Sequence, residues 1–273
     1  MHSINPEEWI GKSIKSEVRL STERYQRYNE WLGRTGHMAE KGDTLPPFGQ
    51  WLYFTEEISD SPLLPAIQSG KYYWYEGTIE SESALRIGDD CQMSSRIMDV
   101  RKIASDKDSY FIQLNQNFSS DGKEAASEQH QILITDHETN HQDIRSIKYE
   151  PDWIHEVTNE QVEFLKKLSP QLMGHFIGDV LTLEKNSGRD SIHLAGPPAL
   201  VLLLEVFDYH FDSRAASRVT YKAFGLAPAE GPFQIAGRDS DSYVTDLSIL
   251  TSNRQVLFTA SIRWRSTWGT SRF

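Results

Sequence analysis

Apolar side chains recur at helical spacing in three segments of the chain. Residues 21–32 (STERYQRYNEWL) open with a Ser/Thr cap and place two Tyr and a Leu on one face before Gly33 can end the helix. Residues 158–168 (TNEQVEFLKKL) form a second capped pattern. Residues 198–211 (PALVLLLEVFDYHF) are apolar nearly all round, which predicts a buried helix. A short aromatic stretch at 48–58 is a further helix candidate.

Between these segments the pattern is that of β-strands. Runs rich in β-branched and aromatic residues are separated by Gly, Asp and Ser clusters, which is typical of an antiparallel meander. The predicted strands cover residues 72–79, 89–100, 110–118 and 128–135, and then 218–224, 233–238, 243–250 and 255–263.

The same order of helix and strands therefore occurs twice. Residues 136–152 are polar without apolar periodicity and separate the two series. We expect an N-terminal lobe over 7–137, a linker over 138–157 and a C-terminal lobe over 158–266. The simplest architecture is α+β, with a buried helix wrapped by an antiparallel sheet in each lobe.

Composition narrows the class of protein. The chain has 273 residues, enough for two lobes of roughly 130 residues each. A formal net charge of −11 disfavours nucleic acid as a partner. No apolar run of ~18 residues is present to span a membrane. A single cysteine, Cys91, fits a reducing compartment, and residues 1–12 resemble neither a signal nor a transit peptide, so we expect a cytoplasmic protein.

Common cofactor and nucleophile motifs are not found. His137 and His141 flank a Glu in the spacing of a zinc protease, but both flanks are polar and offer no face to bury, so we expect no metal. There is no Gly-rich phosphate loop and no Gly-x-Ser-x-Gly elbow, and we expect no cofactor. Cys91 follows Asp89 and Asp90, which would raise rather than lower its pKa.

The most informative stretch for chemistry is residues 173–198 (MGHFIGDVLTLEKNSGRDSIHLAGPP), directly before the apolar helix. A Gly at a helix start leaves a backbone N–H aimed, with the positive end of the helix dipole, at a nearby oxygen anion. Such a donor can stabilise an enolate oxygen. The alternative is an ordinary loop before a proline-started helix.

Several motifs in the right order resemble the MaoC-like group, namely mesaconyl-CoA hydratase-like and fungal 3-hydroxyacyl-thioester dehydratase-like proteins. In the first half these are WIGK (9–12), LPP (45–47) with WLYF (51–54), LRIGD (85–89) and SRIMDV (95–100). In the second half they are Trp153 before Val157-Thr158, RVTYKA (218–223) and PFQIAGR (232–238). The resemblance covers nearly the whole chain and implies a double hot-dog fold with a tunnel between helix and sheet.

The chain departs from this family where water chemistry is performed. The resemblance places the partner of the hydration base at Met173 and the base itself at Gly178, and neither can move a proton. The His of the following Val-His-Gly-Pro-type segment is Ala195, and an Arg usual in the next strand falls at Gly225. The Gly196-Pro197 step is kept.

The groups that remain define the candidate site. The titratable candidates are His175, Asp179, Asp190 and His193, and the retained backbone donor is Gly196. Candidates for an apolar wall, which core packing explains equally well, are Trp51, Tyr53, Tyr72, Trp74 and Phe176.

Three functions remain open on this evidence. The first is an enzyme of specialised metabolism that cyclises or isomerises a small, hydrophobic, unsaturated substrate, for example by a Diels–Alder reaction, through positioning and a carbonyl hydrogen bond. The second is a dehydratase or hydratase of acyl thioesters with displaced groups, using His175 or His193 as the base and Asp179 or Asp190 as its partner. The third is a non-catalytic lobe that binds a ligand or stabilises a partner. A homodimer is an open alternative.

Overall fold

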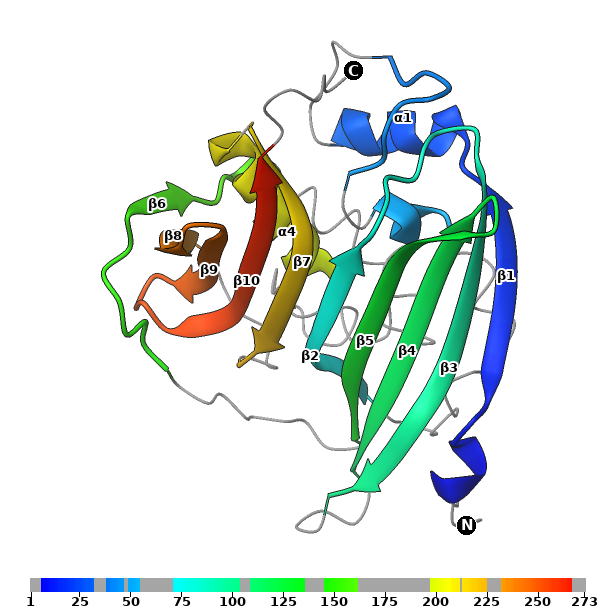
Figure 1. The fold of residues 1–273 in the computed structure, drawn as a ribbon. Helices are drawn as coiled ribbons and strands as arrows, with labels where there is room; N and C mark the ends of the chain where they lie inside the picture. Colours follow the sequence, from blue (N-terminus) through cyan, green and yellow to red (C-terminus); the bar gives the residue numbers. More distant parts are fainter. Residues whose placement is uncertain are drawn as a thin grey trace.

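Ten strands form one continuous sheet in the computed structural model (Figure 1). The structure describes residues 6–31, 38–46, 49–54, 71–103, 109–135, 145–161, 197–211, 213–224 and 232–266. The strands are β1 (Ser13–Arg19), β2 (Lys71–Ser81), β3 (Asp90–Lys102), β4 (Tyr110–Ser120), β5 (Lys123–Thr135), β6 (Trp153–Glu156), β7 (Arg214–Ala223), β8 (Phe233–Asp241), β9 (Val244–Thr251) and β10 (Val256–Ser266). Within the described residues, the helices are α1 (Thr22–Trp31) and α4 (Pro197–His210), with 3-10 turns η1 (Pro6–Trp9) and η2 (Gly49–Leu52).

The sheet order repeats on either side of one central pair. The order is β1-β3-β4-β5-β2-β7-β10-β9-β8-β6, so that reading outward from β2 and from β7 gives corresponding strands. Every neighbouring pair is antiparallel, including β2 with β7, where Glu76 pairs with Lys222 and Glu80 with Arg218. We expected two sheets; they are joined because pairing β2 with β7 satisfies backbone groups that two separate edges would leave open.

All eight strands predicted from the sequence are present, but two further strands were missed. β1 shows no fully buried side chain, only alternation of half-buried and exposed positions. Its half-buried side carries just two apolar residues, Ile14 and Val18, separated by Ser16, which is a weak strand signal. β6 is four residues long and lies inside the segment expected to be a linker. It forms the edge of the sheet by pairing with β8, from Trp153 with Gly237 to Glu156 with Gln234.

The helices agree with the periodicity where the structure describes them. α4 packs against β7, β9 and β10, and its residues from Leu200 to Leu204 are at most 7% exposed, as its all-round apolar pattern predicted (Figure 1). At Thr158 the expected helix start is a reciprocal capping box: Gln161 N donates to Thr158 Oγ1, and Thr158 N donates to Gln161 Oε1. The expected helix at 48–58 is a 3-10 turn, η2, in its described part. In the described ranges, no helix has the length and hydropathy needed to cross a bilayer.

Candidate functional site

Two polar side chains lie side by side in the core of the N-terminal half. Glu128 and His130 are two residues apart on β5, so both project from the face of the sheet that carries the buried side chains, here called the inner face. Both side chains are completely shielded from solvent, and His130 Nε2 lies 2.8 Å from Glu128 Oε2. Burial of an unpaired carboxylate would be costly, so this pair requires further partners.

The turn η2 supplies those partners. Gln50 Nε2 donates to Glu128 Oε1 at 2.8 Å, and Trp51 Nε1 lies 2.9 Å from both carboxylate oxygens. Glu128 therefore accepts hydrogen bonds from two side chains of one 3-10 turn. The consequence is that η2, and with it the Trp51 ring, is fixed against β5.

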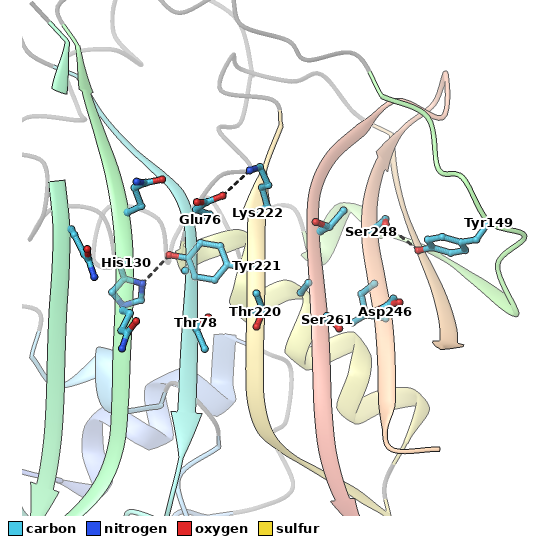
Figure 2. A pocket seen from close by; sticks show the side chains of 17 residues that line it. Glu76, Thr78, His130, Tyr149, Thr220, Tyr221, Lys222, Asp246, Ser248 and Ser261 are labelled. Atoms are coloured by element: carbon cyan, nitrogen blue, oxygen red, sulfur yellow. Dashed lines mark hydrogen bonds and ion pairs between the residues drawn. The ribbon is translucent and has the colours of Figure 1, made fainter. Parts of the chain in front are cut away.

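A tyrosine from the other half of the sheet completes the chain of hydrogen bonds. Tyr221 of β7 reaches across β2, and its hydroxyl lies 2.8 Å from His130 Nδ1 (Figure 2). The residue beneath it is Gly77, where a Cβ would lie 2.7 Å from the Tyr221 oxygen and 2.5 Å from the Gln129 carbonyl oxygen. Only glycine leaves room for this crossing. We call Gln50, Trp51, Glu128, His130 and Tyr221 the polar cluster.

The chemistry of the Glu128 carboxylate fixes the direction of its bond with His130. A carboxylate can only accept, so His130 Nε2 carries a proton and donates to Glu128. Burial, followed by the nearby carboxylates of Glu128 and Glu76, raises the pKa of Tyr221 well above its usual value. Tyr221 is therefore a neutral phenol, and its hydroxyl shares a hydrogen bond with His130 Nδ1. The acid and base groups of the cluster are bound to one another.

Aromatic rings surround the polar cluster. The Trp51 and Trp74 rings meet edge to face, with centroids 5.4 Å apart, and Trp74 lies 4.1 Å from the His130 ring. Tyr221 stacks on Phe258 at 5.6 Å with an interplanar angle of 10°. Such arrangements add attraction beyond the area they bury. The polar cluster is thus lined by buried aromatic rings, which together we call the aromatic surface.

The structure brings together only some of the predicted wall residues. Trp51 and Trp74 are in contact, as described above. Tyr53 is buried but its hydroxyl donates to the Ser21 carbonyl oxygen at 2.7 Å, and burial raises its pKa. Tyr72 pairs with Ile134 through its backbone in β2, and its side chain is outside the described residues.

The predicted chemical groups lie outside the described residues. These are His175, Phe176, Asp179, Asp190, His193 and Gly196, together with His137 and His141 of the zinc-like pattern. Their roles stay predictions. Cys91 is described: it is buried, and burial together with Asp89 raises its pKa to about 12, in the direction expected from the sequence.

The polar cluster was missed by sequence reasoning, although a signal existed. In β5 the alternating positions Glu128, His130, Ile132 and Ile134 lie on one face, and two of them are aliphatic. That alternation could have identified Glu128 and His130 as inward-facing. Gln50 and Tyr221 carried no comparable signal, because their partners are distant in sequence.

Comparison with known proteins identifies the fold. Neither a family model nor a curated protein sequence matches the chain. Among solved structures, the crystal structure of HtdX from Mycobacterium tuberculosis aligns with a TM-score of 0.62 at 15% identity, covering 92% of this chain and 98% of that one. A MaoC-like dehydratase from Phytophthora capsici aligns at 0.67 and 10% identity, covering 96% and 99%.

A third structure widens the set of activities found on this fold. A putative oleoyl thioesterase from Lactobacillus plantarum aligns with a TM-score of 0.56 at 11% identity, covering 94% of this chain and 96% of that one. At such identities the likeness concerns the fold. With its antiparallel sheet and buried helix, the chain has the hot-dog fold of the MaoC-like dehydratases, as the resemblance in its sequence implied.

Proposed function

We propose that this chain is a MaoC-like hot-dog enzyme that cyclises or isomerises an unsaturated, largely apolar substrate. It would hold the substrate in a reactive conformation against the aromatic surface and donate a hydrogen bond to an activating carbonyl. A Diels–Alder cyclisation is one reaction of this kind, since it needs no proton transfer. The Gly196 backbone N–H is the donor that the sequence favours.

One observation supports this proposal most strongly. The inner-face acid and base groups, Glu128, His130 and Tyr221, are bound to one another, and the cluster holds Trp51 in place. An arrangement of this kind positions aromatic rings rather than a water molecule. The sequence agrees, because Met173 and Gly178 stand where the family places its hydration pair.

The proposal includes a division into two lobes, over 7–137 and 158–266, each with a hot-dog arrangement. Support comes from the strand order, which is the same when read outward from β2 and from β7. A substrate tunnel would then lie between the helices and the inner face. Small unsaturated hydrophobic molecules or acyl thioesters are the substrates we propose for it.

A mass-resolved assay tests the proposal. Purified protein is incubated with linear polyenes that carry an activating carbonyl, as free acids and as coenzyme A thioesters, beside crotonyl-CoA. We expect a product of unchanged mass from a polyene and undetectable hydration of crotonyl-CoA. Hydration of crotonyl-CoA near ~10 s⁻¹, a typical enzyme turnover, would contradict the proposal.

One observation favours a second candidate, a hydratase or dehydratase with displaced groups. His130 and Glu128 form an imidazole–carboxylate pair 2.8 Å apart, with Tyr221 on the other ring nitrogen. Such a pair can serve as a general base when substrate displaces one partner. Products heavier by one water, lost in His130→Gln, would favour this candidate. No product of either mass would favour a non-catalytic, ligand-binding protein.

A further inference from the structure

A polar groove lies on the outer face of the sheet, opposite the polar cluster. It crosses the junction of the two halves, over β5, β2, β7, β10 and β9 (Figure 2). This open groove has a volume of about 690 Å³. Where the groove crosses a strand, the middle residue of its stretch points inward, as the buried Tyr221 and Leu247 show, and the residues before and after it point outward into the groove. The volume is in the range of small-molecule sites.

The groove has a wall as well as a floor. Residues 145–152 cross the outer face beside β9, held at one end by Val256 N donating to the Arg145 carbonyl oxygen and at the other by Asp152 N donating to the Gly237 carbonyl oxygen. Tyr149 of this segment faces the floor, with its hydroxyl 3.0 Å from Ser248 Oγ (Figure 2). The groove is therefore a hollow closed along one side by an aromatic residue.

The charged side chains that line the groove are largely paired with one another. The groove's lysine, Lys222, forms an ion pair with Glu76 at 2.6 Å. In its hydrogen-bonding orientation, the Gln131 amide also donates to Glu76 at 3.0 Å. The remaining charged side chain in the lining is Asp246, a carboxylate. An anionic ligand would meet this carboxylate and a cation that is already paired, so the lining side chains are not complementary to phosphate or carboxylate. Outside the lining, the Arg238 guanidinium lies 5.8 Å from the centroid of the Tyr149 ring.

The rest of the lining offers hydroxyls and amides. Six outward side chains make no hydrogen bond to another side chain within the described residues: Thr78, Gln113, Gln129, Thr220, Thr259 and Ser261. Each can both donate and accept. The outward lining provides no large aliphatic side chain for an apolar ligand, and Tyr149 supplies one ring edge or face.

We propose that this groove binds an uncharged saccharide of one or two rings. The alternating hydroxyls of a sugar match rows of side chains that both donate and accept, and Tyr149 provides an aromatic contact for the carbon-bound face of a ring. The site lies on the opposite face from the aromatic surface of the proposed reaction, so it does not depend on that proposal. A permanent dimer through this face is disfavoured, because such interfaces are predominantly apolar.

The test uses the full-length protein and glucose, maltose, cellobiose and sucrose as probes, with binding followed by saturation-transfer NMR and calorimetry. We expect at least one saccharide to bind. Thr78→Val with Thr220→Val, two hydroxyls paired across β2 and β7, should weaken binding about 4- to 100-fold, since each lost hydrogen bond costs roughly 2- to 10-fold. Thr44→Val, the same change at an exposed position outside the groove, should leave binding unchanged.

Four results would overturn the proposal. One is the absence of binding by all four saccharides at millimolar concentration. Another is saccharide binding that the double variant leaves unaltered. The third is displacement of a bound saccharide by inorganic phosphate. The fourth is a dimer in sedimentation velocity whose formation excludes the sugar.

Discussion

The two halves of the sheet have corresponding strands but different inner faces. In the N-terminal half, β5 directs Glu128 and His130 into the core. Its counterpart in the C-terminal half, β10, directs Phe258, Ala260 and Ile262 inward, and all three are buried. One half is therefore built around a polar cluster and the other around hydrocarbon side chains.

This difference indicates where the chain is specialised. Hydrocarbon packing is sufficient to stabilise the fold, and buried ionisable groups are weak evidence of added stability. A carboxylate that accepts hydrogen bonds from Gln50 and Trp51 instead fixes the position of a turn and of an aromatic ring. We conclude that the N-terminal half supplies four of the five residues of the polar cluster, to which the C-terminal half adds Tyr221.

The largest expected effect comes from breaking the polar cluster. His130→Leu removes a hydrogen-bond donor of the buried Glu128 and the partner of the Tyr221 hydroxyl. We expect it to lower the free energy of unfolding by about 3–5 kcal/mol, because each buried polar group left unsatisfied costs about 1–3 kcal/mol, and more when it is charged. Ile262→Val, the conservative change on β10, should cost only about 0.5–1.5 kcal/mol. Urea unfolding of both variants measures the difference. Equal costs would show that the two inner faces are energetically alike.

A smaller loss of stability is expected at Gly77, where the Tyr221 side chain passes over β2. Gly77→Ala places a methyl group against the Tyr221 hydroxyl and the Gln129 carbonyl, and overpacking of this kind costs about 1–3 kcal/mol. Part of that cost should disappear in the Tyr221→Phe background, where the oxygen is absent. A double-mutant cycle in urea measures this coupling. Strictly additive costs would rule out a close approach of the Tyr221 hydroxyl oxygen to residue 77.

Above pH 9, the change of the unfolding free energy with pH should depend on Cys91. Its pKa is raised from 9.0 to about 12, so the folded state keeps a proton that the unfolded state loses as pH rises above about 9. The stabilisation is complete below that pH and is lost between pH 9 and 12. In this range the unfolding free energy falls as pH rises. Cys91→Ala should make that fall less steep by about 1.4 kcal/mol per pH unit. Identical slopes in urea titrations from pH 9 to 11 would contradict the buried thiol.

The fold was largely predictable because its signals are local. The all-round apolar stretch that became α4 and the β-rich runs are patterns within single segments. β1 and β6 were missed because an edge strand buries little and so needs no apolar stripe. The joining of both halves into one sheet depends on β2 and β7, which lie more than a hundred residues apart and show no sign of their pairing in sequence.

The candidate site was only partly predictable. Trp51 and Trp74 were identified as wall candidates by residue type, and they do meet on the inner face. The cluster that holds them was missed because Gln50, Glu128 and Tyr221 come together only through tertiary structure. Their hydrogen bonds depend on register across three strands and on the absence of a side chain at Gly77.

The central claim is that the chain works by positioning and a carbonyl hydrogen bond, without an acid/base group that changes protonation state. The direct test is the pH–rate profile of the mass-conserving reaction between about pH 6 and 9, for the wild type and for His130→Gln, His175→Ala and His193→Ala. We predict a nearly flat profile for each enzyme, with no variant losing a limb. A bell-shaped profile with a limb near the His pKa of ~6.5, absent from one His variant, would contradict the account.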